Sequence, residues 1–281
     1  MLADLATAQR LVDLSVTLSE HLPCSWPGHV PYVHKNWNWF EEATLPTGGS
    51  CCSTGPYQTN FLVIDEHCGT HCDGPTHFIP PSSSGLPWAG AGGDRGGEWI
   101  DLAHLTGPAA VIDVRHLAAE AGEPGVSPEI GLAELERWES EHGPFRDGEV
   151  VLLWTGWDAH YVRGEAGRRF VSDPLVTSSA PGWPALAADA ALYLHERRVR
   201  TVGIDAPSMG SVENPAPVHQ KALSRGMYFI EMLTNLHLLP SRGSYFIFLP
   251  LKIADSTGGP GRAVAFPPQG NSQRPAPRRS G

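Results

Sequence analysis

The sequence predicts a mixed α/β fold in a single domain. Three observations lead to this prediction: short runs of branched and aromatic residues, two longer stretches with helical periodicity, and 41% hydrophobic residues, which is enough for one core. A chain of 281 residues is long enough for one large or two small domains. No internal repeat or long linker divides it, so we expect one.

Six runs are predicted to form strands because they concentrate β-branched and aromatic residues: 60–64, 109–114, 150–154, 201–204, 228–233 and 245–249. Two helices are predicted, over 127–142 and 184–198. In the first, Ser127 can cap the helix and Pro128 suits its first turn. In the second, Leu186, Ala190 and Leu194 share one face.

Two stretches, 45–56 and 80–97, are too rich in glycine, proline and serine for regular structure. The second directly follows His77 and is either a lid over a binding site or a solvated insertion. From Phe266 onward the chain has almost nothing to bury and several prolines. We therefore expect a domain over 1–265 and a disordered, Pro- and Arg-rich tail over 266–281.

The composition points to a small-molecule partner. With 20 basic against 30 acidic residues, the net charge of -10 disfavours binding to nucleic acid or to an anionic membrane. The N-terminus lacks the features of a signal peptide, and no run approaches the ~20 apolar residues of a membrane helix, so we expect a cytoplasmic protein. Five cysteines in such a chain are expected to be reduced thiols.

The densest chemical signal is the placement of His67, His71, Asp73 and His77 at even separations. An extended backbone would point all four side chains to one side. A helix would rotate Asp73 away, and the two glycines and the proline within the segment would break it. An extended or looped segment with converging ligands is therefore expected.

Two imidazoles and a carboxylate suit zinc or manganese. The alternative is that these are ordinary hydrogen-bonded histidines, but three of them and an aspartate lie within eleven positions. Cys68 and Cys72 stand at odd offsets, so we expect them to face away as small buried residues. Closed structural zinc sites are mostly cysteine-rich, and a His/Asp site favours an open, catalytic ion.

The run His-Cys-Gly-Thr-His-Cys-Asp-Gly-Pro-Thr-His resembles the H-x-G-T-H-x-D-x-P-x-H signature of the cyclase-like metal-dependent hydrolases, which include bacterial kynurenine formamidase and isatin hydrolase. The resemblance extends over most of the chain, through segments 26–28, 153–157, 203–208, 217–219, 230–236 and 249–253. It implies a swivelling β/β/α fold, a homodimer or homotetramer, and one or two divalent ions.

By position, the resemblance makes His67, His71 and Asp73 ligands of a first ion. His219 and Glu231 would complete that site or hold a second ion. His77 matches the general acid/base, and Glu231 is counted with it among the catalytic residues.

The residues themselves give some evidence on the assignment of Glu231 and none on that of His219. Glu231 interrupts an apolar strand, so it is either a buried carboxylate that needs a cation or a solvent-facing residue of an edge strand. His219 carries no independent signal, since a histidine at that point could equally end a loop.

The function expected from these residues is hydrolysis of an amide or lactone bond in a cyclic or aromatic small molecule through metal-activated water. The alternative is a metal-dependent cyclase or dehydratase acting on a polyketide-like substrate. A serine hydrolase is disfavoured because there is no G-x-S-x-G motif. Four aromatic residues would either widen the pocket beyond the needs of a formamidase or cover the core: Trp37, Trp39, Phe40 and Trp88.

Overall fold

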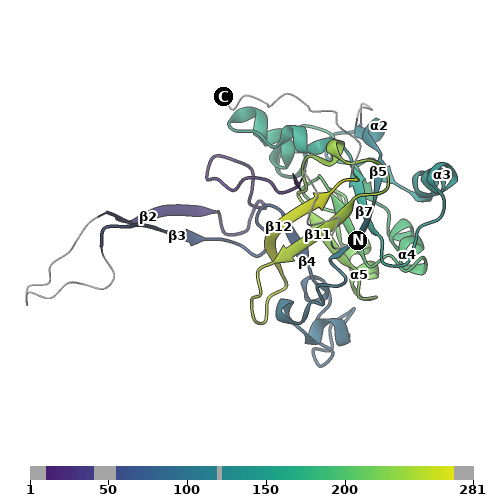
Figure 1. Cartoon of the computed structure of the whole chain (residues 1–281), viewed down its shortest axis with the longest axis horizontal. Helices are drawn as coiled ribbons and strands as arrows, with labels where there is room; N and C mark the ends of the chain where they lie inside the picture. The colour runs from purple at the N-terminus through teal and green to yellow at the C-terminus, as the bar shows by residue number, and fades with distance from the viewer. Residues whose placement is uncertain (1–10, 41–54, 119–121, 269–281) are drawn as a thin grey trace, which may run out of the picture.

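The computed structural model describes residues 11–40, 55–118 and 122–268 (Figure 1). It confirms a mixed α/β architecture built around one sheet. The strands are β1 Val12–Asp13, β2 Val33–Trp39, β3 Gln58–Val63, β4 His71–Asp73, β5 Thr106–Asp113, β6 Glu129–Ile130, β7 Val150–Trp154, β8 Ala185–Leu186, β9 Thr201–Ile204, β10 Tyr228–Glu231, β11 Tyr245–Pro250 and β12 Gly258–Phe266. The α-helices are α2 Arg115–Ala118, α3 Leu132–His142, α4 Ala188–Glu196 and α5 Ala216–Leu223.

Seven of the strands close into a mixed barrel. Their order is β12-β11-β5-β7-β9-β10-β4, and β4 pairs again with β12. Neighbours from β5 to β10 are parallel, whereas the remaining pairs are antiparallel. The short β1 adds to the side of β12. Because the barrel is closed, its strands have no free edge, and β4 is hydrogen-bonded to β10 on one side and to β12 on the other.

Alternating residues of the parallel strands serve two cores. Ala109, Val111 and Leu152 point into the barrel interior, where Phe246 and Phe248 also pack. Their chain neighbours on β5, β7 and β9 form the other core together with apolar residues of α3, α4 and α5. Figure 1 shows these helices on one side of the barrel. This double burial explains why the parallel strands are continuous apolar runs.

The predicted strands all occur, but the two helices start later than expected. Residues Glu129–Ile130 and Ala185–Leu186 pair with each other as β6 and β8. The N-cap of α3 is therefore Gly131, and the Ser127 hydroxyl instead accepts the Val212 N–H at 3.0 Å. A short parallel pairing has replaced the first helical turns. Among the described residues, no helix is long and apolar enough to cross a membrane.

Strand β12 was not predicted, because its glycines and proline resemble a loop. The barrel closure explains this composition. A Cβ added at Gly258 would lie 2.0 Å from the Cys72 carbonyl oxygen, and one at Gly261 would lie 2.3 Å from the Leu249 carbonyl oxygen. Neighbouring backbones approach too closely for any side chain at these positions.

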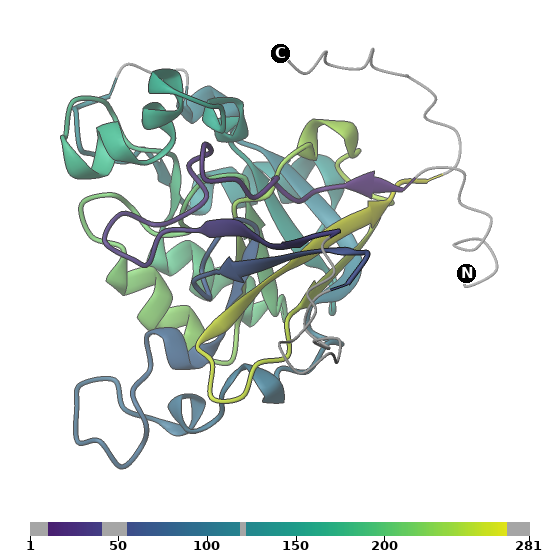
Figure 2. The ribbon, with the colours of Figure 1, turned by 90° about the vertical axis from the view of Figure 1, so that its left-hand side faces the viewer.

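Strands β2 and β3 form an isolated antiparallel arm that projects from the body on the side opposite the helices (Figures 1 and 2). All six residues of β3 are exposed. The predicted loop 45–56 lies almost wholly outside the described residues, and so does the predicted tail beyond residue 268.

Candidate metal centre

Five buried side chains from four parts of the chain converge at one end of β4. His71 and Asp73 lie on β4 and point to the same face, as the even spacing predicted. Glu231 ends β10 directly opposite His71. His67 comes from the turn before β4, and His219 comes from α5. The sequence-predicted ligands are thus brought together, although only β4 is extended.

The donor atoms of four of these residues form a closed ring of similar distances. His71 Nε2 lies 3.3 Å from Asp73 Oδ1 and 3.5 Å from Glu231 Oε2. His219 Nε2 lies 3.4 Å from Asp73 Oδ2 and 3.3 Å from Glu231 Oε1. Two ligands of a tetrahedral ion with bonds of about 2.0–2.1 Å stand roughly 3.3 Å apart. The spacing therefore fits a divalent metal.

The carboxylates divide the centre into two overlapping sets of ligands. One set is His67, His71 and Asp73, and the other is Asp73, His219 and Glu231. Asp73 and Glu231 each offer one oxygen toward His71 and the other toward His219. These two sets could hold one ion or two.

Backbone carbonyls fix the tautomers of two histidines. His71 Nδ1 donates to the Gly69 carbonyl oxygen at 2.7 Å, and His219 Nδ1 donates to the Pro215 carbonyl oxygen at 2.7 Å. Each Nε2 is therefore left to face the carboxylates. Such outer hydrogen bonds orient imidazole ligands toward a metal. Gly69 has a φ of 64°, a left-handed conformation that suits glycine.

His67 is oriented by a relay that uses its other ring nitrogen. The Thr257 hydroxyl donates to Glu66 Oε2 at 2.7 Å, so it accepts from His67 Nε2 at 2.9 Å. Nδ1 lies 2.8 Å from Asp73 Oδ1, on the side of the ligand set, so it is the nitrogen that would bind the ion. His67 therefore presents Nδ1, whereas the other two histidines present Nε2.

Glu231 is a buried carboxylate, 4% exposed, and its strand lies between β9 and β4. The edge-strand alternative is therefore wrong. Its Oε1 accepts the Met209 N–H at 2.6 Å and the Ser208 hydroxyl at 3.3 Å. Burial opposes ionisation of this group, but hydrogen bonds from His219 and His71 lower its pKa. Glu231 is thus held ionised and oriented toward the centre.

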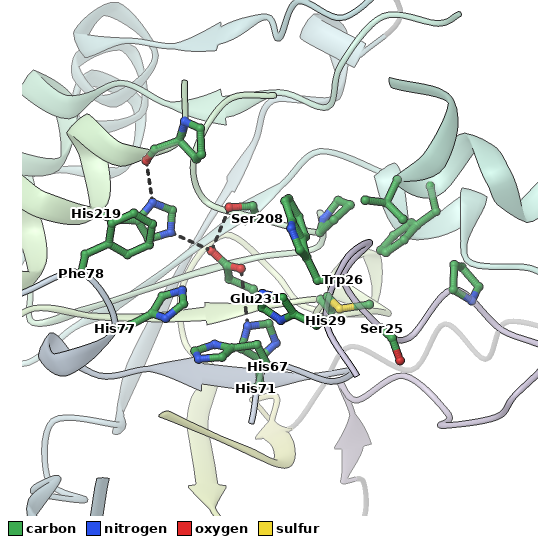
Figure 3. A pocket seen from close by; sticks show the side chains of 16 residues that line it. Ser25, Trp26, His29, His67, His71, His77, Phe78, Ser208, His219 and Glu231 are labelled. Carbon is green, nitrogen blue, oxygen red and sulfur yellow. Dashed lines mark hydrogen bonds and ion pairs between the residues drawn. The ribbon is translucent and has the colours of Figure 1, made fainter. Parts of the chain in front are cut away.

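His77 lies beside the ligands but in neither set. It ends a 3-10 turn, Pro75–His77, rather than extending β4. Its ring stacks on His67 with centroids 3.9 Å apart and an interplanar angle of 28° (Figure 3). Burial lowers the pKa of His77 to about 4. An uncharged imidazole next to a metal site can accept a proton.

The two cysteines near the signature are buried and outside both ligand sets. Cys72 packs in the barrel interior between His71 and Asp73 of β4, on the opposite face. Cys68 lies 3.9 Å from the Ser25 hydroxyl. Both placements match the expectation of small buried residues.

A cavity of about 190 Å³ opens onto the centre (Figure 3). Apolar side chains form most of its wall: Pro23, Trp26, Phe78, Phe170, Val171, Pro207, Pro215 and Met232. Neither alternative for the four aromatic residues holds, because none lines this cavity and all are exposed: Trp37 67%, Trp39 59%, Phe40 59% and Trp88 44%. No residue of the described 80–97 loop lines this cavity, so the lid is wrong as well. That loop packs beside Pro75, where Gly92 approaches it.

Sequence reasoning missed the residues that orient the ligands. Thr257 is 190 positions from His67, and Met209 acts through its backbone N–H. No spacing or residue type could have identified either. Ser208 lies in the segment 203–208 that carries the resemblance, but nothing in the sequence indicates that its hydroxyl contacts Glu231.

Comparisons with known proteins agree with this geometry. A sequence model of the family described as "Putative cyclase" matches residues 12–211. Isatin hydrolase of Roseibium aggregatum is 31% identical over 225 residues, which are 77% of this chain and 78% of that protein. Kynurenine formamidase of Bacillus mycoides is 27% identical over 258 residues, 91% of this chain and 97% of that protein.

Solved structures extend the similarity to the fold. Isatin hydrolase A from Labrenzia aggregata, bound to benzyl benzoate, superposes with a TM-score of 0.73 at 26% identity, covering 94% of this chain and 98% of that one. An isatin hydrolase bound to the product analogue thioisatinate gives a TM-score of 0.76 at 23% identity, covering 95% and 98%. The chain belongs to the cyclase family and is a metal-dependent hydrolase.

Proposed function

We propose that this enzyme hydrolyses an amide or lactone bond, C–N or C–O, in a cyclic or aromatic small molecule. The observation that carries the proposal is the ring of donor atoms at 3.3–3.5 Å with an uncoordinated imidazole, His77, beside it. The similarity to an isatin hydrolase and to kynurenine formamidases supports an amide of an aromatic compound.

The donor set favours zinc or manganese, because it consists of nitrogen and oxygen atoms without a thiolate. When bound, such an ion lowers the pKa of a water ligand to about 7 and polarises a carbonyl. His67, His71, Asp73, His219 and Glu231 are the proposed ligands. The two overlapping sets allow one ion or two.

His77 is the proposed general acid/base. Its pKa of about 4 and its position on the cavity wall leave the imidazole free to take a proton from the attacking water. It then returns that proton to the nitrogen or oxygen atom that leaves the carbonyl carbon. Glu231 contributes to catalysis as a negatively charged ligand next to the site of this proton transfer.

The size of the cavity supports a small substrate. An engineered cavity of 150 Å³ binds benzene, so about 190 Å³ suits a single or fused aromatic ring. A polyketide-like chain that must fold before ring closure requires more room. The family description keeps a cyclase or dehydratase as the second candidate.

Labelled water distinguishes the two reactions. The metal-loaded enzyme should open isatin or cleave an N-formyl aromatic amine, with one oxygen-18 from water in the resulting acid. A product formed by loss of water, without label, would contradict hydrolysis and support the cyclase candidate.

We further propose a homodimer formed through the arm. On one face of the arm Val33 faces Val63 and Trp37 packs on Phe61 with centroids 6.2 Å apart, so this face carries an apolar patch. Lys35, opposite Phe61 on the same face, is paired with Glu20. An isolated two-stranded hairpin is at best marginally stable in water. Each aromatic side chain can bury about 150–250 Å². Trp37 and Phe61 together could therefore supply about 300–500 Å² of the ~800 Å² per partner of a standard interface.

Three further expectations from the sequence stay predictions. They are the swivelling β/β/α description of the fold, the division into 1–265 and a disordered tail, and a cytoplasmic location.

A further inference from the structure

A tight turn at the cavity rim carries one aromatic and one polar side chain. The sequence Trp26-Pro27-Gly28-His29 has a Gly28 φ of 93°, and the His29 N–H donates to the Trp26 carbonyl oxygen at 3.1 Å. These are the features of a type II β-turn with proline and glycine at its centre. Both end residues, Trp26 and His29, line the cavity (Figure 3).

Asp65 determines which nitrogen of His29 carries the proton. Asp65 Oδ1 lies 3.2 Å from His29 Nδ1 and also accepts the His67 N–H at 2.8 Å. A carboxylate only accepts hydrogen bonds, so Nδ1 carries the proton. In the neutral imidazole Nε2 is then an acceptor. The His29 and His67 ring centroids lie 6.4 Å apart, which places the His29 ring next to the metal centre.

The other polar side chains of the cavity outside the centre are already engaged. The Ser25 hydroxyl accepts the Tyr32 N–H at 2.9 Å. The Ser208 hydroxyl accepts the Gly210 N–H at 3.1 Å and donates to Glu231. His77 is assigned to proton transfer. The His29 side chain is 38% exposed at the cavity rim, and among the described residues its Nε2 has no hydrogen-bond partner. This nitrogen is therefore the acceptor left for a substrate that enters the cavity.

We propose that His29 is a substrate-positioning residue whose Nε2 accepts a hydrogen bond from an N–H group adjacent to the scissile carbonyl. This inference rests on the proposed function and specifies its substrate. With Trp26 against the ring, His29 would select a secondary lactam or anilide over an N-alkyl amide or a lactone. A site built to bind an N–H group discriminates against analogues that lack it.

The test uses isatin and N-methylisatin, which share a carbonyl and differ in the N–H group. The metal-loaded wild-type protein should prefer isatin by roughly tenfold in kcat/KM, about what one hydrogen bond supplies. In His29→Ala the ratio should fall to about one while the metal content is retained. His29→Gln, whose amide oxygen can accept near the same position, should restore part of the preference. His34→Ala, on the arm, is the matched control and should keep the wild-type ratio.

An unchanged isatin preference in His29→Ala would overturn the inference and leave the proposed function standing. Loss of metal in His29→Ala would also overturn it, because the residue would then be structural. Binding of both compounds to His77→Ala, measured by calorimetry, provides the same ratio without turnover. If wild-type protein cleaves neither compound and His77→Ala binds neither, the proposed substrate class fails together with the inference.

Discussion

His71 lies directly opposite Glu231 across the antiparallel strands β4 and β10, and its Nε2 is 3.5 Å from Glu231 Oε2. Burial opposes the charged form of His71, but the Asp73 and Glu231 carboxylates raise its pKa to about 10. The same two carboxylates overcome burial and raise the pKa of His219 to about 10. Without a metal, both imidazoles are therefore protonated near neutral pH.

Metal-free protein should therefore lose stability as the pH rises from about 6.5 to about 10. A raised pKa contributes stability that is complete below the unfolded value and is lost as the pH passes the folded value. Metal affinity should increase over the same range, because the ligands must release protons to bind. Melting temperatures of chelator-treated and metal-loaded protein measure both effects. Parallel pH profiles for the two forms would contradict this account.

Asp73→Asn and His77→Ala should separate metal binding from proton transfer. Asp73 belongs to both ligand sets, so its replacement should lower metal affinity by more than the ~10–100-fold typical of supporting residues, and activity with it. His77→Ala should keep its metal and lose roughly 10²–10⁴-fold in kcat. Elemental analysis measures the bound metal, and steady-state kinetics measures kcat. Equal metal loss in the two variants would make His77 a ligand.

Thr257→Val should weaken metal binding without touching a ligand. The substitution removes the hydroxyl that links His67 Nε2 to Glu66, so His67 is no longer fixed in tautomer or orientation. The expected loss is about 10–100-fold in affinity, measured by competition with a chromophoric chelator. Thr234→Val is a matched control, since its hydroxyl contacts Asp158 instead. Similar effects in both variants would indicate a general loss of stability.

Trp37→Lys or Phe61→Lys should dissociate the proposed dimer while the metal centre stays intact. A charge on the apolar patch of the arm would cost about 2 kcal/mol or more, which corresponds to ~30-fold in the dimer dissociation constant. Sedimentation velocity across a concentration series measures this change. Gln58→Lys, opposite Trp39 on the arm, is the control. An unaltered dimer in the two arm variants, or a monomeric wild type, would refute the arm as the interface.

The sequence predicted the ligands on β4 because they are close together in the chain and alternate with the period of a strand. It also predicted the strands that pack on two cores, since their apolar runs are unambiguous. The sequence did not predict roles that depend on contact with a backbone segment far away in the chain. The composition of β12 made sense only against Cys72 and Leu249, and α3 lost its first turns to a pairing with β8.

The aromatic residues of β2 show a second limit. Tryptophans near a predicted site were interpreted as pocket wall or core cover, because a single sequence gives no sign that a hairpin leaves the body. Trp26, which does line the cavity, stands out in the sequence only as part of the segment 26–28 that carries the resemblance. The position of these aromatic residues depends on the tertiary fold, which their residue type does not indicate.

The closure of the barrel by β12 ties the orientation of the metal centre to a strand pairing between distant parts of the chain. Thr257 and Gly258 meet His67 and Cys72 only when the last strand has paired with β4, nearly two hundred residues from its partner. Distant strand pairings form slowly. His67 is therefore oriented by Thr257 only after β12 has closed the barrel. On refolding, metal affinity should reach its final value together with this closure, and metal bound before closure should exchange more freely.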